Sequence, residues 1–91
     1  MLFAPSGALL EACVLALLKR EDLYGYMLTQ NMQSVANLSE STLYPVLRRL
    51  EKQGLLRVYD QQFQGRNRRY YAITAAGRAQ LEAYRAEWNE Y

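Results

Sequence analysis

The sequence predicts a mainly α-helical fold with one small β-hairpin, and two patterns support this prediction. Apolar residues recur at helical spacing between residues 7 and 53 and again after Thr74, whereas apolar and polar residues alternate after Gly54. At 91 residues, the chain has a size at which a single domain has only a modest core. We therefore expect one small domain that a second subunit would stabilise.

The composition is typical of a soluble globular protein. Apolar residues make up 51% of the chain, charged residues make up 22%, and the formal net charge is +2. These values exclude a disordered chain, a collagen-like repeat and a disulfide scaffold. The longest apolar stretch, residues 8–18, is shorter than the roughly 20 residues of a membrane span. It also lacks the preceding basic residues of a signal peptide, so we expect a cytoplasmic protein without a membrane partner.

The residue types that carry most catalytic and metal-binding chemistry are scarce. The chain has no histidine, and its one cysteine, Cys13, has no second thiol with which to form a disulfide. We expect Cys13 to be a small buried hydrophobe in a reducing compartment. The sequence also has no glycine-rich phosphate loop. The expectation is therefore that the protein is not an enzyme and binds no cofactor or metal.

The first two helices are predicted over residues 7–19 and 23–35. The first helix is apolar on nearly every side, which indicates burial on more than one face. Because one small domain cannot easily cover both faces, we expect a partner subunit to cover the second. A short turn over residues 36–38 follows the second helix. The buried stripe of that helix is expected to comprise Tyr24, Leu28, Met32 and Val35.

The third helix is predicted to begin between Ser39 and Tyr44 and to run to about Gln53. Either Ser39 or Ser41 is its N-cap, and Gly54 ends it in a left-handed conformation. Its buried stripe comprises Leu43, Val46, Leu47 and Leu50. The residues expected to point away from that stripe are Ser41, Tyr44, Pro45, Arg48 and Lys52.

A β-hairpin and a last helix complete the predicted fold. The hairpin strands lie around Val58 and Tyr71, and residues 61–67 form a long, mobile tip. Thr74 is expected to cap the last helix, which covers residues 75–91. This helix is expected to clasp a partner together with the first helix. Its heptad-spaced seam comprises Gly77, Leu81, Tyr84, Trp88 and Tyr91.

The order of these elements predicts a winged helix-turn-helix. Residues 1–74 form the DNA-binding domain, and residues 75–91 form a C-terminal dimerisation helix. Residues 40–74 carry seven basic and three acidic side chains, a net +4, while the rest of the chain carries −2. The chain is therefore basic where DNA would lie. A charged helix face is normally only solvated, so a protein-interaction module without sequence-specific DNA binding stays open as the alternative.

Two segments resemble motifs of the PadR family of bacterial transcriptional regulators. Residues 42–56 (TLYPVLRRLEKQGLL) resemble its recognition-helix motif, and residues 70–77 (YYAITAAG) are similar to its strand-to-helix junction after the wing. Residues 24–26 (YGY) are similar to its usual His-Gly-Tyr at the start of the second helix. The end of the chain at Tyr91 favours the short, multidrug-sensor-like branch over the phenolic-acid-sensing branch, which has a longer C-terminal domain.

The resemblance implies a homodimeric repressor that binds operator DNA with inverted half-sites. The family's DNA contacts fall here on Ser41, Thr42, Tyr44 and Arg48 in the third helix and on Arg66 and Arg68 in the wing. Lys52 is expected to add a phosphate contact. In the multidrug-sensing branch, a tryptophan at the position of Trp88 pairs with its mate across the dimer axis and holds flat hydrophobic ligands. Tyr84 belongs to the same aromatic seam, which is either a slot for a planar aromatic effector or a plain interface anchor.

Overall fold

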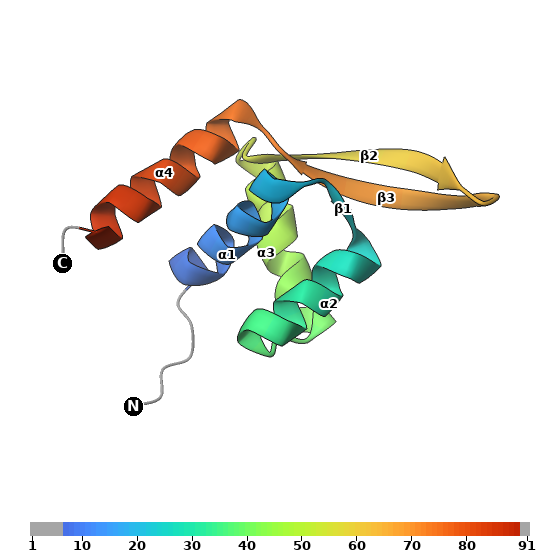
Figure 1. The fold of residues 1–91 in the computed structure, drawn as a ribbon, viewed down its shortest axis with the longest axis horizontal. Helices are drawn as coiled ribbons and strands as arrows, with labels where there is room; N and C mark the ends of the chain where they lie inside the picture. Colours follow the sequence, from blue (N-terminus) through green and yellow to red (C-terminus); the bar gives the residue numbers. More distant parts are fainter. Residues whose placement is uncertain (1–6, 90–91) are drawn as a thin grey trace.

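The structure, a computed structural model, describes residues 7–89, with the side chains of residues 36 and 89 left out. A body of three helices carries a β-hairpin on one side, and a fourth helix lies beside α1 on the other side (Figure 1). The described elements are α1 (Gly7–Arg20), β1 (Leu23–Tyr24), α2 (Gly25–Ala36), α3 (Glu40–Lys52), β2 (Leu56–Phe63), β3 (Arg66–Ile73) and α4 (Ala75–Asn89). This arrangement confirms the predicted mainly α-helical fold with a hairpin wing.

The core lies where α1, α2 and α3 meet the base of the hairpin. Each helix contributes side chains that are almost completely buried, among them Leu15, Leu28 and Leu47. The predicted stripe of α3 is confirmed, because all four of its members are buried. The outward-pointing side chains of α3 are exposed, also as predicted. Removing this apolar area from water is the main stabilisation available to so small a domain.

The predicted second helix begins two residues too early, and its predicted buried stripe is wrong at Val35. Leu23 and Tyr24 form strand β1, which pairs antiparallel with Tyr71 and Tyr70 of β3. The sheet therefore has three strands in the order β1-β3-β2. The short segment after α1 pairs with backbone groups on the edge of β3 that β2 leaves open. At the other end, Val35 is 61% exposed and does not belong to the buried stripe.

Residues at the ends of α2 and α3 explain how the two helices are joined. Asn37 has a left-handed φ of 54° and redirects the chain after α2, so that Leu38 packs against the core in place of Val35. Ser39 is the N-cap of α3, since its Oγ accepts a hydrogen bond from the Thr42 backbone N–H at 3.4 Å. Beyond the C-terminus of α3, Gly54 has a φ of 77°, as the predicted left-handed position requires.

The wing is longer and more regular than the sequence indicated. Strands β2 and β3 continue to Phe63 and Arg66, and only Gln64 and Gly65 connect them. Both connecting residues have positive φ, 51° and 78°, as in the two-residue turn that suits a twisted hairpin. The predicted mobile tip over residues 61–67 is therefore wrong. Most of these residues are exposed in the strands that project from the helices, so no apolar alternation marked them as strand.

Two features fix the start of helix α4 to the wing: the N-terminal cap at Thr74 and the close packing of Gly77. Thr74 Oγ1 accepts a hydrogen bond from the Gly77 backbone N–H at 3.0 Å and donates one to the Gly54 carbonyl at 2.7 Å. The predicted cap is confirmed. Gly77 lies directly against the backbone of Leu55, and a Cβ at this position would lie 2.8 Å from Ile73 Cγ1. None of the helices in the described part of the chain has the length and apolarity needed to cross a membrane.

Replacing Gly77 by alanine should destabilise the protein, although alanine normally favours a helix. The added methyl group meets backbone at Leu55, which cannot move aside as a flexible side chain would. Overpacking of this kind costs about 1–3 kcal/mol, which lowers the Tm of a domain of this size by roughly 5–20 °C. Thermal unfolding followed by circular dichroism measures the effect. Ala76→Ser, on the exposed side of the same turn, should melt near the wild type, and equal melting of both variants would contradict the close approach.

Candidate nucleic-acid interface

The outward side of α3 presents the polar and aromatic side chains that were predicted to read DNA. Ser41, Thr42, Arg48 and Lys52 are exposed, and Tyr44 is 37% exposed. The hydroxyl groups lie in a small cluster at the helix N-terminus, where Ser39 Oγ is 3.0 Å from Ser41 Oγ and 3.2 Å from Thr42 Oγ1. Because these hydroxyl groups can both donate and accept, the cluster can rearrange to contact base edges or phosphate oxygens.

The two consecutive arginines of α3 have different environments. Arg49 Nε donates to Glu11 Oε2 of α1 at 2.7 Å, so this arginine holds α3 against α1. Within the described residues, Arg48 is in no ion pair, and with Tyr44, Glu51 and Arg69 it lines a depression of about 340 Å³ between α3 and β3. Arg48 is thus the member of the pair that is available to an external partner.

The two wing arginines also differ. Arg66 is exposed at the wing tip, next to the two-residue turn. Arg68 is partly buried, with its guanidinium 4.2 Å from the ring centroid of Tyr24 and 4.1 Å from that of Phe63. Such cation–π contacts fix the side chain but leave its charge in place. Arg68 therefore joins the wing to the start of α2, while Arg66 keeps its conformational freedom.

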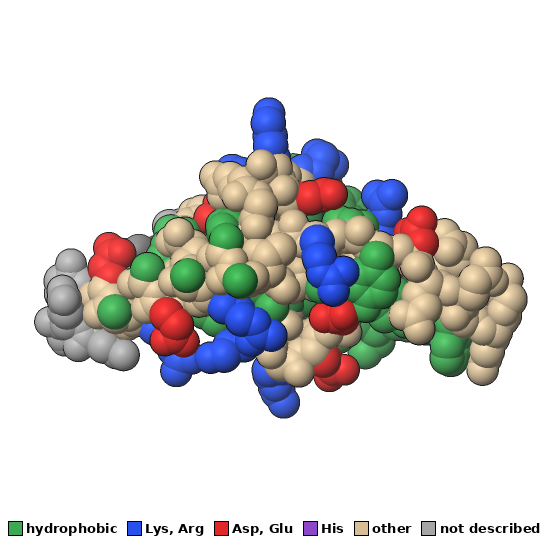
Figure 2. Space-filling model, turned by 90° about the horizontal axis from the view of Figure 1, so that it is seen from above, with side chains coloured by type: hydrophobic (Ala, Val, Ile, Leu, Met, Phe, Trp, Pro, Cys, Tyr) green, Lys and Arg blue, Asp and Glu red, His purple; other side chains and the backbone are tan. Residues whose placement is uncertain are grey.

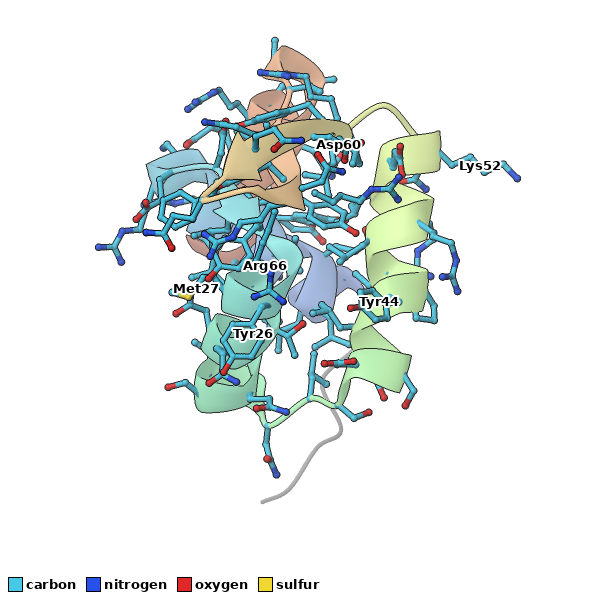
Figure 3. The ribbon with its side chains drawn as sticks, turned by 90° about the vertical axis from the view of Figure 1, so that its right-hand side faces the viewer. Tyr26, Met27, Tyr44, Lys52, Asp60 and Arg66 are labelled. Atoms are coloured by element: carbon cyan, nitrogen blue, oxygen red, sulfur yellow. The ribbon has the colours of Figure 1, made fainter. Side chains whose placement is uncertain are left out.

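Tyr26 belongs to the same surface, although it was not among the predicted site residues. It lies in the first turn of α2 and is 63% exposed. With Tyr24, Arg66, Asn67 and Arg68 it lines a depression of about 490 Å³ between α2 and the wing. Figure 3 looks at the molecule from the wing side and shows Tyr26 and Arg66 close together, with Tyr44 across from them on α3. The YGY motif was the available signal, but the sequence could not show that strand β3 of the wing lies beside it.

Basic side chains occur on several sides of the molecule, with acidic side chains between them. In Figure 2 the Lys and Arg side chains gather around the middle of the molecule, and those of Asp and Glu are interspersed. Part of this charge is neutralised locally. Arg69 Nε lies 3.9 Å from Asp60 Oδ1 across the β2–β3 pair, and Lys19 Nζ lies 3.4 Å from Glu82 Oε1. The exposed cations outside these ion pairs include those of α3 and the wing tip, and also Arg20, Arg57, Arg78 and Arg85 elsewhere on the described surface.

An apolar groove lies between α1 and α4, well away from the wing. Its volume is about 230 Å³, and its lining side chains are Leu9, Ala12, Cys13, Ala16, Leu81, Arg85 and Trp88. Cys13 is only partly buried here, and burial raises the pKa of its thiol. The second apolar side of α1 thus stays partly uncovered within one chain. A surface of this kind is typical of a subunit interface or a ligand groove.

The two predicted effector residues lie next to each other on α4. The rings of Tyr84 and Trp88 stack with centroids 5.7 Å apart and an interplanar angle of 10°. Only Trp88, which is 41% exposed, lines the groove. The Tyr84 hydroxyl donates to Glu11 Oε1 at 3.1 Å, and burial followed by this hydrogen bond raises the pKa of Tyr84. The fifth member of the predicted seam, Tyr91, lies outside the described residues.

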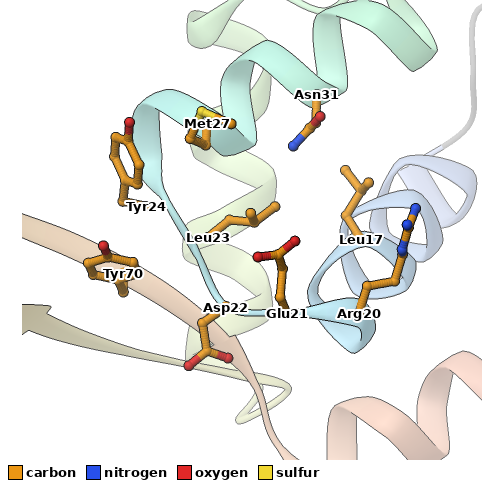
Figure 4. A pocket seen from close by; sticks show the side chains of 9 residues that line it. All are labelled: Leu17, Arg20, Glu21, Asp22, Leu23, Tyr24, Met27, Asn31 and Tyr70. Atoms are coloured by element: carbon orange, nitrogen blue, oxygen red, sulfur yellow. The ribbon is translucent and has the colours of Figure 1, made fainter.

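A further depression, of about 510 Å³, lies where α1, β1 and α2 meet (Figure 4). Its walls combine apolar residues such as Leu17 and Met27 with the charged residues Arg20 and Glu21. The neighbouring Asp22 accepts a hydrogen bond from the Tyr59 hydroxyl at 2.6 Å, which raises the pKa of Tyr59 and ties β2 to the end of α1. Across the described residues, no three His, Cys, Asp or Glu side chains come together as a metal site needs.

The helices, the three-stranded sheet and the projecting hairpin define a winged helix-turn-helix protein. Residues 14–83 match the Transcriptional regulator PadR-like family, and the chain belongs to that family. The resemblance inferred from the recognition-helix and wing-junction motifs is thereby confirmed. The protein is a PadR-like transcriptional regulator, and DNA is its partner.

Individual relatives agree with this assignment. The Transcriptional regulator Rv3488 of Mycobacterium tuberculosis is 44% identical over 61 residues, which cover 66% of this chain and 57% of that protein. The crystal structure of smu.1704 from Streptococcus mutans UA159 has a TM-score of 0.88 at 42% identity and covers 100% of this chain and 86% of that one. A PadR-like transcriptional regulator from Bacillus cereus has a TM-score of 0.82 at 33% identity, covering 89% and 82% of the two chains.

Proposed function

We propose that this PadR-like regulator is a homodimeric repressor that binds an inverted-repeat operator through α3 and the wing. The observation that carries the proposal is the common orientation of α3 and the wing tip. Tyr44 and Arg66 face the same side of the molecule, with Tyr26 beside the wing (Figure 3). The cations Arg48, Lys52 and Arg66 have no ion-pair partner among the described residues. A bound protein that fills the major groove would exclude other proteins from that DNA, which is how repression would arise.

The proposed contacts fall into two groups. Ser41, Tyr44 and Arg48 would read base edges, since a helix in the major groove places the first turns of its outward face against the bases. Phosphate contacts would come from Thr42, Lys52, Arg66 and Arg68. Tyr26 joins the second group, because its exposed hydroxyl lies beside Arg66 at the start of α2, where backbone N–H groups also favour an anion.

Dimerisation is proposed to use the α1–α4 groove. Leu9, Ala16 and Trp88 leave apolar surface exposed there, and burial of such surface in a second copy is favourable. A twofold-symmetric dimer would place two α3 helices in successive major grooves, about 34–36 Å apart. The same groove is where we propose that a planar aromatic effector binds against Trp88 and releases the protein from DNA.

Strong salt dependence is the first expected property of this protein as a DNA-binding dimer. If the dimer contacts roughly 6–8 phosphates, its affinity for duplex DNA should fall by about 10³–10⁵ between roughly 50 and 200 mM salt. The reason is that the Lys and Arg side chains of the protein release counterions from the DNA when they bind, and added salt opposes that release. Fluorescence anisotropy of a labelled duplex at several salt concentrations measures this slope. A flat salt dependence would count against the proposed interface and favour a protein-interaction module.

Effector binding should be visible in the emission of Trp88, the one tryptophan of the chain. A planar aromatic compound that stacks on the exposed side of this indole should quench its fluorescence. A panel of flat cationic and neutral aromatic compounds, titrated into the purified protein, measures the quenching. Leu9→Ala, which shortens a side chain that lines the groove and leaves both aromatic residues in the chain, should shift the apparent Kd of any true ligand. No quenching by the whole panel would leave Trp88 as an interface anchor alone.

A further inference from the structure

Glu11 is the point at which three helices of the described chain are joined by polar contacts. It lies on α1, and its two carboxylate oxygens accept hydrogen bonds from different helices. Oε2 accepts from Arg49 Nε of α3 at 2.7 Å, and Oε1 accepts from the Tyr84 hydroxyl of α4 at 3.1 Å. The Glu11 side chain is only 12% exposed, so little water is available to replace either donor. If either donor were removed, a largely buried carboxylate oxygen would be left without a hydrogen-bond partner, which costs free energy.

Each partner of Glu11 leads to a different part of the molecule. Arg49 precedes the end of α3 by one turn and follows the outward-pointing Arg48 directly in the chain. Tyr84 stacks on Trp88, which lines the α1–α4 groove. A continuous series of contacts, Trp88–Tyr84–Glu11–Arg49, therefore extends from the groove to α3. A separate contact between α1 and α4, the Lys19–Glu82 ion pair, is exposed at both ends and does not involve α3.

We propose that Glu11 is a positioning residue that couples the α1–α4 groove to the recognition helix. A change at Trp88 shifts the Tyr84 ring stacked on it, and the Tyr84 hydroxyl then changes its hold on Glu11. Glu11 in turn resets the angle at which Arg49 holds α3 against α1. Coupling between two sites is reciprocal, so DNA bound to α3 must also alter the surroundings of Trp88. This inference rests on the proposed use of α3 for DNA binding.

The reciprocal effect provides a direct test in the full chain. Trp88 emission is recorded while a duplex is titrated in, and anisotropy of the labelled duplex reports binding independently. We expect DNA to change the Trp88 emission of the wild type. Tyr84→Phe keeps the stacked ring and removes only the hydroxyl, and it should reduce this change at least two-fold while the protein still binds the duplex. Glu11→Gln, which has the same shape but no charge, should do the same.

Lys19→Gln is the matched control, because it breaks the Lys19–Glu82 ion pair between α1 and α4 without changing the contacts of Glu11. It should leave the emission change as in the wild type. The coupling is wrong if wild-type emission does not respond to bound DNA, or if Tyr84→Phe responds as strongly as the wild type. The Tyr84→Phe variant tests the coupling by itself, even if Glu11→Gln fails to fold. A wild type that binds no duplex by anisotropy overturns the proposed function, and the coupling with it.

Discussion

Replacing Arg48 by alanine should remove most of the preference of the protein for its operator over random DNA. Arg48 lies in the middle of the outward side of α3 and is in no ion pair within the described residues. A bidentate arginine–guanine contact is worth about 1–3 kcal/mol of base discrimination. With one such contact in each half-site, the ratio of operator to random-DNA affinity of a homodimer should fall by roughly 30-fold to 10⁴-fold. Competition binding with labelled operator and unlabelled random duplex measures this ratio.

Arg66→Ala is the control, because it removes a charge from the wing tip without touching α3. We expect operator and random DNA to lose affinity by the same factor, since phosphate contacts carry no sequence information. The slope of affinity against salt should also become shallower by about one unit for each phosphate that is no longer neutralised. Arg68 is a poorer control because alanine there would also remove the packing of its guanidinium on Tyr24 and Phe63. Equal effects of Arg48→Ala and Arg66→Ala on both DNAs would exclude Arg48 from base recognition.

Introducing a glutamate at Ala16 should convert the proposed dimer to a monomer. Ala16 is exposed in the single chain and lines the apolar α1–α4 groove, so the substitution should leave the fold of each subunit intact. In a dimer that buries this groove, the new carboxylate would lose its water without gaining a partner, at an effective cost of several kcal/mol for each of the two charges. The dimer Kd should therefore rise by at least about 10³-fold. Operator affinity should fall with it, because a monomer contacts only one half-site.

Ala79→Glu adds the same charge on the exposed side of α4, outside the groove, and should leave the dimer unchanged. Molar mass from light scattering after gel filtration, at micromolar protein, distinguishes the two forms. Circular dichroism checks that both variants keep the helix content of the wild type. If Ala16→Glu remains dimeric, the subunits associate through another surface.

The parts of the fold that were predictable from the sequence are those that bury one face against the core. The apolar stripe of α3 and the cap at Thr74 are local patterns with a single favourable solution, and both predictions are confirmed. The wing tip has no buried face. Its residues 61–67 therefore carried no alternating signal, although most of them lie in β2 and β3. Strand β1 was missed because two residues are too short to show a period, and only the open edge of β3 gives them their conformation.

The candidate site was predictable as a set of residue types but not as a set of contacts. Helical spacing placed Arg48 on the outward side of α3, while nothing in the sequence indicated that Arg49 pairs with Glu11, which lies 38 positions earlier. The sequence likewise did not indicate that Arg68 contacts two aromatic rings. These contacts depend on the wing lying beside the start of α2, which is a tertiary relationship. Tyr26 was overlooked for that reason as well.

Selection from a random duplex pool tests the central claim most directly. The purified protein is mixed with random-sequence duplexes at about 150 mM salt, the retained DNA is sequenced, and the molar mass of the protein is measured in parallel. A homodimeric operator-binding regulator should enrich an inverted repeat whose half-sites lie about 10 base pairs apart, and its mass should be that of a dimer. A well-folded dimer that enriches no sequence would contradict the account and indicate a winged-helix module that binds other proteins.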